Sequence, residues 1–126
     1  MELHHTHQLR FWTLHRPIFW GEVALFQEGE EVGKVGFAAG VEGILIGPTE
    51  ELQLQIRPPW QGNGYGTRLI QGTVEYITGL IDHYDFSPRR LYAYTLKENI
   101  PARKTLEENG FAGREKKSYV QYEKRV

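Results

Sequence analysis

The sequence predicts a mixed α/β fold, in which a mostly antiparallel sheet is combined with two main helices at about residues 66–83 and 100–109. Short segments in which apolar and polar residues alternate recur along the chain, as half-buried strands require. Two further segments carry apolar residues at helical spacing, and breaks rich in glycine or proline separate the segments. Since the chain has 126 residues, we expect a single domain over residues 1–126.

The strand predictions follow side-chain alternation and the positions of turn residues. The turn at residues 28–31 predicts a hairpin between the second and third strands, and residues 85–88 form a loop. The predicted strands are residues 8–15, 22–27, 32–39, 43–46, 50–57, 90–96 and 118–124.

The first predicted helix has one apolar stripe, formed by Leu69, Ile70, Val74, Ile77, Leu80 and Ile81. Gly72 and Gly79 each cost this helix about 1 kcal/mol relative to alanine, so they either pack closely against the sheet or are simply tolerated. The second helix is complete in its signals: Asn99 is a good N-cap, Pro101 lies in the first turn, and Gly110 ends the helix.

The composition excludes several classes of function. The net charge is −1, so no whole-molecule field favours nucleic acid or an anionic membrane. The absence of cysteine excludes disulfides and a thiol nucleophile and fits a reducing, cytoplasmic location. No apolar run reaches the roughly 18 residues of a membrane span, and no signal-peptide core is present. The basic residues Arg114, Lys116 and Lys117 are expected in a solvated turn.

His4, His5 and His7 near the N-terminus allow two interpretations, a metal site or a frayed terminus. No other cluster of ligand residues accompanies them, so the sequence favours the frayed terminus and no bound metal.

A loop with three glycines follows the predicted strand at residues 50–57, and a helix follows the loop. Gly62, Gly64 and Gly66 let the backbone approach a ligand, and the helix N-terminus adds positive potential, so the segment is suited to phosphate binding. It lacks the Gly-Lys-Ser/Thr sequence of a Walker loop. It also lacks the glycine that a dinucleotide fingerprint has three residues after its second glycine, where this chain has Thr67. The alternative is a tight strand-to-helix turn that binds no ligand.

Two motifs in order resemble the GNAT superfamily of acetyl-CoA-dependent N-acetyltransferases. Residues 61–66, Gln-Gly-Asn-Gly-Tyr-Gly, look like its Gln/Arg-x-x-Gly-x-Gly/Ala loop. Residues 99–111 look like its Asn-x-x-Ala/Ser…Leu-Glu-x-x-Gly-Phe motif. The Leu-Glu form, with Gly-Tyr-Gly-Thr after the loop, is most similar to the branch that acetylates the N-termini of ribosomal proteins. The resemblance covers about residues 44–112.

The resemblance implies acetyl-CoA as cosubstrate, a primary amine of a peptide N-terminus or small molecule as acceptor, and direct transfer in a ternary complex. The backbone of residues 62–67 would hold the pyrophosphate, with charge from Arg57 or Arg68. The pantetheine arm would lie between residues 54–56 and residues 91–94. The expected cofactor-binding residues are Leu54, Ile56, Gln61, Gly62, Asn63, Gly64, Tyr65, Gly66, Thr67, Arg68 and Asn99.

The candidate catalytic residues are Glu51, Asn99 and Tyr119. Glu51 matches the acidic residue at the start of this strand in the resembling branch and is expected to act as a general base, directly or through water. The alternative is a surface glutamate, with Glu50 as the alternative base. Asn99 caps its helix and can also reach the pantetheine. Many GNAT enzymes have a tyrosine acid where this chain has Leu106, and the substitutes for it are Tyr119, Tyr122 and Tyr94.

One departure from the family concerns the two helices that usually separate its first and second strands and wall the acceptor pocket. Here only residues 16–21 separate the predicted strands, which is too short for two helices. The sheet face with Gln53, Gln55 and Arg57 is therefore either solvated or covered by the second subunit of a homodimer. Two further functions stay open, a non-catalytic acyl-CoA-binding module and a protein-interaction domain.

Overall fold

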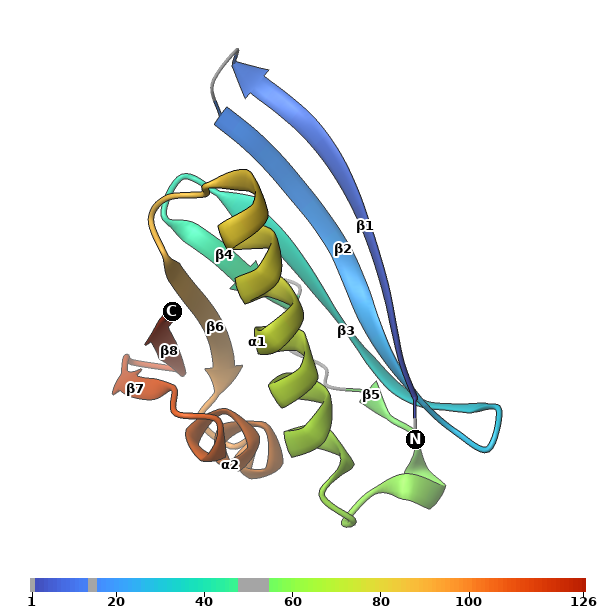
Figure 1. The fold of residues 1–126 in the computed structure, drawn as a ribbon. Coiled ribbons are helices and arrows are strands. Elements are labelled where there is room, and N and C mark those ends of the chain that lie inside the picture. The colour runs from blue at the N-terminus through green and yellow to red at the C-terminus, as the bar shows by residue number, and fades with distance from the viewer. Residues whose placement is uncertain (1, 14–15, 48–54) are drawn as a thin grey trace.

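The structure, a computed structural model, describes residues 2–13, 16–47 and 55–126 (Figure 1). Its elements in chain order are β1 (Glu2–Thr13), β2 (Arg16–Gln27), β3 (Glu30–Gly40), β4 (Gly43–Ile46), β5 (Gln55–Ile56), a 3-10 turn (Pro58–Trp60), α1 (Tyr65–Tyr84), β6 (Arg90–Leu96), α2 (Ile100–Glu108), β7 (Ala112–Glu115) and β8 (Tyr119–Arg125).

The strands form one mixed sheet in the order β1-β2-β3-β4-β6-β8-β7, and β5 pairs with β3. All neighbours are antiparallel except β4 and β6, which run parallel. Helices α1 and α2 lie side by side on the same face of this sheet (Figure 1). The predicted fold class, a mostly antiparallel sheet with two main helices, is confirmed.

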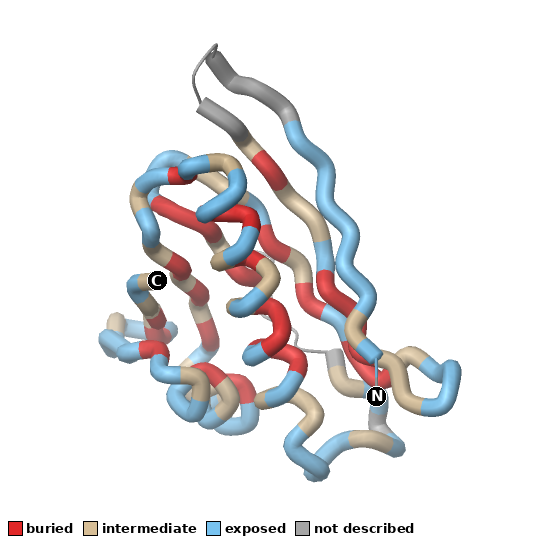
Figure 2. Tube along the Cα trace, in the orientation of Figure 1, coloured by how far each residue is buried: buried red, intermediate tan, exposed pale blue. Residues whose placement is uncertain are grey.

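The hydrophobic core lies between the helices and the sheet, where Figure 2 shows the buried residues. The predicted stripe of α1 is buried except for Val74, which is partly buried and packs against the core. From the strands, Phe19 packs its ring against the rings of Phe37 and Phe86. Leu106 of α2 is fully buried. Burial of this apolar surface is the main favourable term in folding.

The N-terminal hairpin differs from its prediction. β1 begins at Glu2 rather than residue 8, so the three histidines lie in a strand and not in a frayed terminus. Residues 2–11 of β1 pair in continuous antiparallel register with β2, which begins at Arg16 rather than residue 22. Only residues 14 and 15 therefore separate the first two strands, which leaves no room for the two helices that the GNAT resemblance would place there.

The C-terminal strands also show a difference. β7 was not predicted, because its four residues are all exposed and carry no alternation. Arg114 lies in this strand rather than in a turn, while Lys116 and Lys117 lie between β7 and β8. The prediction for 90–96 agrees with β6 at both ends.

The two helix glycines have different explanations. A Cβ atom on Gly72 would lie 2.3 Å from Cδ1 of Leu3 in β1, so this glycine allows close packing of α1 against the sheet. A Cβ atom on Gly79 would meet no atom within 4 Å, so that glycine is tolerated at the surface.

Candidate functional site

The two strands β4 and β5 lie along the same neighbour, β3, but out of register with each other. Ile46 of β4 lies opposite Phe37, and Gln55 of β5 lies opposite Lys34. A continuous strand would place residue 49 opposite Lys34, so six additional residues separate β4 from β5. Parallel pairing of β4 with β6 covers only Leu91 and Tyr92 of β6. Among the described residues, β6 beyond Tyr92 pairs only with β8, so the sheet splays open beside β5.

Ile56 of β5 directs its backbone groups toward the splayed side. The N–H of Arg57 donates to the carbonyl oxygen of Val32 in β3 at 2.8 Å. Since hydrogen-bonding direction alternates along an antiparallel strand, the N–H and carbonyl of Ile56 point away from β3. Its carbonyl accepts from Nε2 of Gln61 at 2.9 Å. Its N–H has no acceptor among the described residues, so it is available to a ligand.

The glycine loop leads into α1 with left-handed backbone at Gly62 (φ 80°) and at Gly64 (φ 76°), the N-cap of the helix. A Cβ atom on either would meet nothing within 4 Å, so the space outside the loop is open. The first α1 bond runs from the N–H of Arg68 to the carbonyl of Gly64. The N–H of Asn63 closes the turn at residues 61–62, whereas the N–H groups of Gly62 and of residues 64–67 have no backbone or side-chain acceptor in the described part of the chain. Such unsatisfied groups at a helix N-terminus attract an anion.

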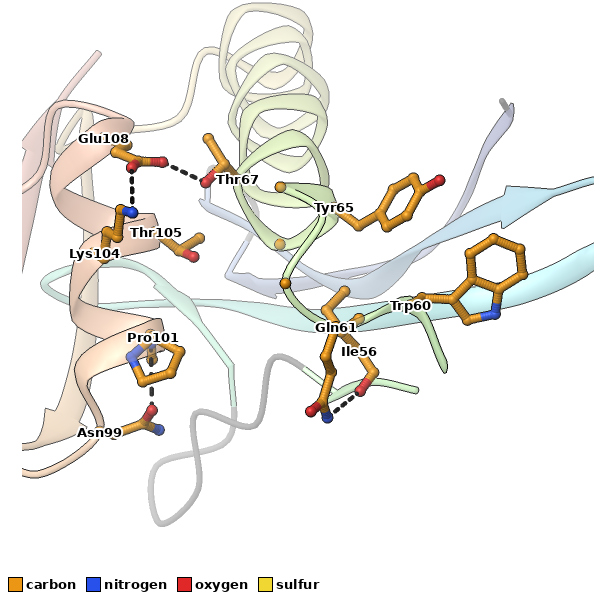
Figure 3. A pocket seen from close by; sticks show the side chains of 14 residues that line it. Ile56, Trp60, Gln61, Tyr65, Thr67, Asn99, Pro101, Lys104, Thr105 and Glu108 are labelled. Carbon is orange, nitrogen blue, oxygen red and sulfur yellow. Dashed lines mark hydrogen bonds and ion pairs between the residues drawn. The ribbon is translucent and has the colours of Figure 1, made fainter. Parts of the chain in front are cut away.

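A cavity of about 620 Å³ lies in front of these N–H groups. One wall is the loop and the start of α1, and the other wall is α2 (Figure 3). Its lining residues are Ile56, Trp60, Gln61, Gly62, Gly64, Tyr65, Gly66, Thr67, Asn99, Pro101, Ala102, Lys104, Thr105 and Glu108. The volume is in the range of pockets that hold small molecules and cofactors.

Contacts between the two helices fix the shape of this cavity. The hydroxyl of Thr67 donates to Glu108 Oε2 at 2.7 Å, and Nδ2 of Asn109 donates to the carbonyl of Thr67 at 3.1 Å. A Cβ atom on Gly66 would lie 3.3 Å from Oγ1 of Thr105, so the third glycine allows the helices to approach. Gly66 is therefore explained by packing, whereas Gly62 and Gly64 are explained by the loop.

The charges at the cavity come mainly from α2. Lys104 Nζ lies 3.8 Å from Glu108 Oε1 (Figure 3), and both side chains are accessible to solvent. The two arginines expected to add charge do not line the cavity: Arg68 is exposed, and Arg57 forms an ion pair with Glu31 at 3.6 Å. The backbone N–H groups, rather than arginine side chains, therefore supply the positive potential at the loop.

Most of the predicted cofactor residues lie at this cavity, but Asn63 and Arg68 do not line it. The amide of Asn63 instead donates to the carbonyls of Trp60 and Gln61, which fixes the loop. The side chain of Asn99 accepts from the N–H of Ala102 at 3.3 Å, as a helix cap, while the residue also lines the cavity. Leu54 lies outside the described residues.

The catalytic candidates are only partly placed. Glu51 and Glu50 lie outside the described residues. Tyr119 begins β8, is 38% exposed, and its ring contacts that of Tyr94 at 5.8 Å. Tyr119 pairs with Leu96, so Tyr119 and Tyr94 lie on the same face of the sheet. Ala93 and Thr95 lie on the opposite face, where they are buried.

Tyr122 is placed differently from the other tyrosines. It is 1% exposed, and its hydroxyl donates to Glu107 Oε2 at 2.9 Å and accepts from Nε of Arg103 at 3.2 Å. Burial raises the pKa of Tyr122, and the hydrogen bond from Arg103 opposes that rise. A hydroxyl held in this way serves the packing of α2 on β8, so Tyr122 is the weakest of the three candidate acids.

Sequence reasoning did not assign six lining residues, namely Trp60, Pro101, Ala102, Lys104, Thr105 and Glu108. Trp60 directly precedes the loop and packs edge-on against Tyr65, with ring centroids 5.7 Å apart. The spacing of Lys104 and Glu108 identifies one helix face. Nothing local indicates that this face turns toward the loop.

No group of three or more residues suited to metal binding occurs among the described residues. Within the same part of the chain, neither helix has the length and apolar character that a membrane crossing requires.

Solved structures with the same arrangement of elements are numerous. The chain is 22% identical to the Campylobacter jejuni N-acetyltransferase PseH in complex with acetyl coenzyme A (TM-score 0.59; 86% of this chain and 67% of that one). It is 16% identical to the Vibrio cholerae spermidine N-acetyltransferase in complex with CoA and spermine (TM-score 0.66; 84% and 65%). A ribosomal α-N-protein acetyltransferase in complex with coenzyme A is also similar (16% identity; TM-score 0.65; 85% and 62%).

These likenesses show the fold, and the ribosomal-protein enzyme is one of several relatives of comparable similarity. The chain spans between 61% and 68% of the length of these proteins and of two further GNAT structures. None of the curated proteins is significantly similar to the chain in sequence. The family model of the acetyltransferase (GNAT) domain matches residues 3–112. The match covers most of the chain, which therefore belongs to the GNAT acetyltransferase family.

Proposed function

We propose that the protein is an N-acetyltransferase that moves an acetyl group from acetyl-CoA to a primary amine by direct transfer in a ternary complex. The observation that carries the proposal is the set of N–H groups at Gly62 and residues 64–67, which have no acceptor in the described part of the chain and face a cavity between two helices. Backbone donors at a helix N-terminus are suited to a diphosphate. GNAT membership and relatives crystallised with CoA or acetyl-CoA support the choice of cosubstrate.

The proposed binding mode uses both halves of the site. The pyrophosphate contacts the N–H groups of the loop, and the adenosine end lies along the wall formed by α2. The pantetheine arm, which carries two amides, enters the splay between β5 and β6. There the N–H of Ile56, which has no acceptor among the described residues, is a donor for the thioester carbonyl, and this bond strengthens as negative charge develops on the oxygen.

In the proposed reaction the amine nitrogen attacks the thioester carbonyl carbon, the C–S bond breaks, and CoA leaves as a thiol. Glu51 takes the proton of the attacking amine, directly or through water, and Tyr119 or Tyr94 gives a proton to the thiolate. Such acid–base help typically contributes 10²–10⁴ in rate, whereas positioning can contribute about 7–11 kcal/mol. The absence of a tyrosine at Leu106 is therefore compatible with activity.

The acceptor is proposed only as a primary amine. Among the relatives, one is a spermidine N-acetyltransferase bound to spermine, and another is an α-N-protein acetyltransferase of the ribosomal protein L7/L12. The likeness of the Leu106-Glu107 pair to the ribosomal-protein branch favours a peptide N-terminus. Because β1 and β2 are joined directly, the acceptor either brings its own surface or reaches a pocket that another subunit completes.

The test combines binding with turnover. We expect acetyl-CoA at a hundredfold excess over its dissociation constant to stabilise the protein by about 2.7 kcal/mol, which raises the melting temperature by several degrees. We also expect thiol release with at least one of three acceptor classes, namely peptides, polyamines and aminoglycosides, and slower release in Glu51→Gln.

The outcomes separate the alternatives. Stabilisation without thiol release, and with no effect of Glu51→Gln on binding, would instead favour a non-catalytic acyl-CoA-binding module. No stabilisation at millimolar acetyl-CoA would favour a protein-interaction domain and contradict the proposal.

A further inference from the structure

Strand β1 is the outer edge of the sheet, and Figure 1 shows it with no described element beyond it. Its register with β2 is uninterrupted from Glu2 to Phe11, so the edge has no bulge over ten residues. Residues 2–9 contain no proline and no lysine. Bulges, prolines and lysines usually protect a long edge strand, because the free N–H and carbonyl groups of such a strand otherwise pair with another strand.

The order of residues along this edge is nearly symmetric. Residues 3–9 read Leu-His-His-Thr-His-Gln-Leu, with Thr6 at the centre. In antiparallel pairing about Thr6, Leu3 lies opposite the partner's Leu9, and Thr6 lies opposite the partner's Thr6. In this register, residue n lies opposite residue 12 − n of the partner strand, so odd-numbered residues pair with odd-numbered ones and even with even. The N–H and carbonyl groups that point away from β2 in one copy therefore face those of the other copy.

The leucine at the far end of this stretch lacks cover within the described structure. Leu9 lies opposite Phe19 of β2, on the face toward α1, yet 38% of its surface is exposed. Leu3 lies on the same face and is partly buried against the core. Pairing about Thr6 would place each exposed Leu9 beside a Leu3 that the core already holds in place, and apolar cross-strand pairs of this kind stabilise a sheet.

Contacts behind the strand hold the edge in position. The His7 ring hydrogen bonds through Nδ1 to the Tyr76 hydroxyl and through Nε2 to the Tyr84 hydroxyl at 3.4 Å. The His5 ring stacks on Tyr76 with ring centroids 4.3 Å apart. A strand anchored to α1 in this way loses little conformational freedom when it pairs, which favours association.

We propose that two copies of this chain associate through antiparallel pairing of their β1 strands about a two-fold axis at Thr6, which joins the two sheets into one. Residues 2–10 of each copy would contribute roughly eight to ten ladder hydrogen bonds in total. A second copy is the occupant because only a strand with the same symmetric order matches leucine to leucine along the whole edge. An isologous contact of this kind closes after two subunits.

The proposed contact is separate from the cofactor cavity. β2 and β3 separate β1 from β4, and no residue of β1 lines the cavity. The inference is independent of the proposed transferase activity.

The test places charge on the axis. Thr6 is exposed and lies opposite Glu22 of β2. In a homodimer, Thr6→Lys brings two like charges together, and so does Thr6→Glu. We expect the wild type to sediment with twice the mass of one chain at millimolar concentration and each variant to sediment as a monomer. An equimolar mixture of the two variants should restore the dimer, because the charges are then opposite.

Controls keep the result interpretable. Gln71→Lys adds the same charge at an exposed position of α1 and should remain dimeric. Circular dichroism and the melting temperature show whether each variant is folded, and the mixture reports on pairing even if one variant is less stable. A monomeric wild type at millimolar concentration, or a dimer that Thr6→Lys and Thr6→Glu leave intact, would overturn the inference. A monomer whose edge instead binds an extended peptide would indicate a different partner.

Discussion

Gly64→Asp is expected to abolish the rise in melting temperature that acetyl-CoA produces, whereas Gly64→Asn is expected to retain most of it. Gly64 has left-handed backbone (φ 76°), which aspartate and asparagine tolerate better than other side chains do. Both variants therefore carry a similar backbone strain and differ mainly in charge. The new carboxylate would lie beside the N–H groups of residues 62–67, where the diphosphate is proposed to bind.

The size of this effect follows from electrostatics. Two unit charges about 4 Å apart repel by about 4 kcal/mol at the effective dielectric constant of a protein surface, so we expect at least a hundredfold loss of affinity. Calorimetric titration of both variants with CoA measures it. Wild-type affinity in both variants would show that no anion approaches this loop, and an equal loss of affinity in both would indicate strain instead of charge.

Gly21→Ala is expected to lower the free energy of unfolding by about 3 kcal/mol or more. A Cβ atom on Gly21 would lie 1.9 Å from the carbonyl oxygen of Thr6 and 2.8 Å from Cα of His7, both in β1. These are backbone atoms of a paired strand, so β1 must move away from β2 and the contacts of His7 with α1 are lost.

The matched control is Gly36→Ala in the neighbouring strand. Its Cβ would lie 3.7 Å from the carbonyl oxygen of Gly21, which is an ordinary contact. We expect urea unfolding to show a midpoint close to wild type for Gly36→Ala and a much lower one for Gly21→Ala. Similar midpoints for the two variants would contradict the close approach of β1 to β2.

The sequence predicted those elements whose signals are local. Asn99 and Gly110 marked the start and the end of α2. The alternation of apolar and polar residues in β6 predicted both ends of that strand. The N-terminal half of β1 could not be predicted in this way, because three of its residues are histidines, which carry no strong local preference, and a single threonine is too weak a strand signal. Pairing with β2 and stacking on Tyr76 of α1 determine its conformation, and these contacts connect positions distant in the sequence.

The site shows the same division. Gly62 and Gly64 were predicted to form a ligand loop from their spacing, and both have the backbone that such a loop needs. The sequence assigned Gly66 to the same loop; Gly66 lines the cavity, and its contact with Thr105 shows that it also allows the close packing of α1 against α2. The wall that α2 contributes depends on how two helices cross, which no local pattern specifies.

The most direct test of the central claim, that the glycine loop binds the diphosphate of CoA, is a titration of the ¹⁵N-labelled protein with CoA, followed by the backbone amide resonances. We expect the amide protons of residues 62–67 to shift together and saturably, because they then hydrogen bond to the bound diphosphate. The amides of the β2–β3 turn at Glu28 and Gly29 should stay unchanged. If CoA leaves the loop resonances unmoved, or moves only those elsewhere in the chain, the claim is wrong.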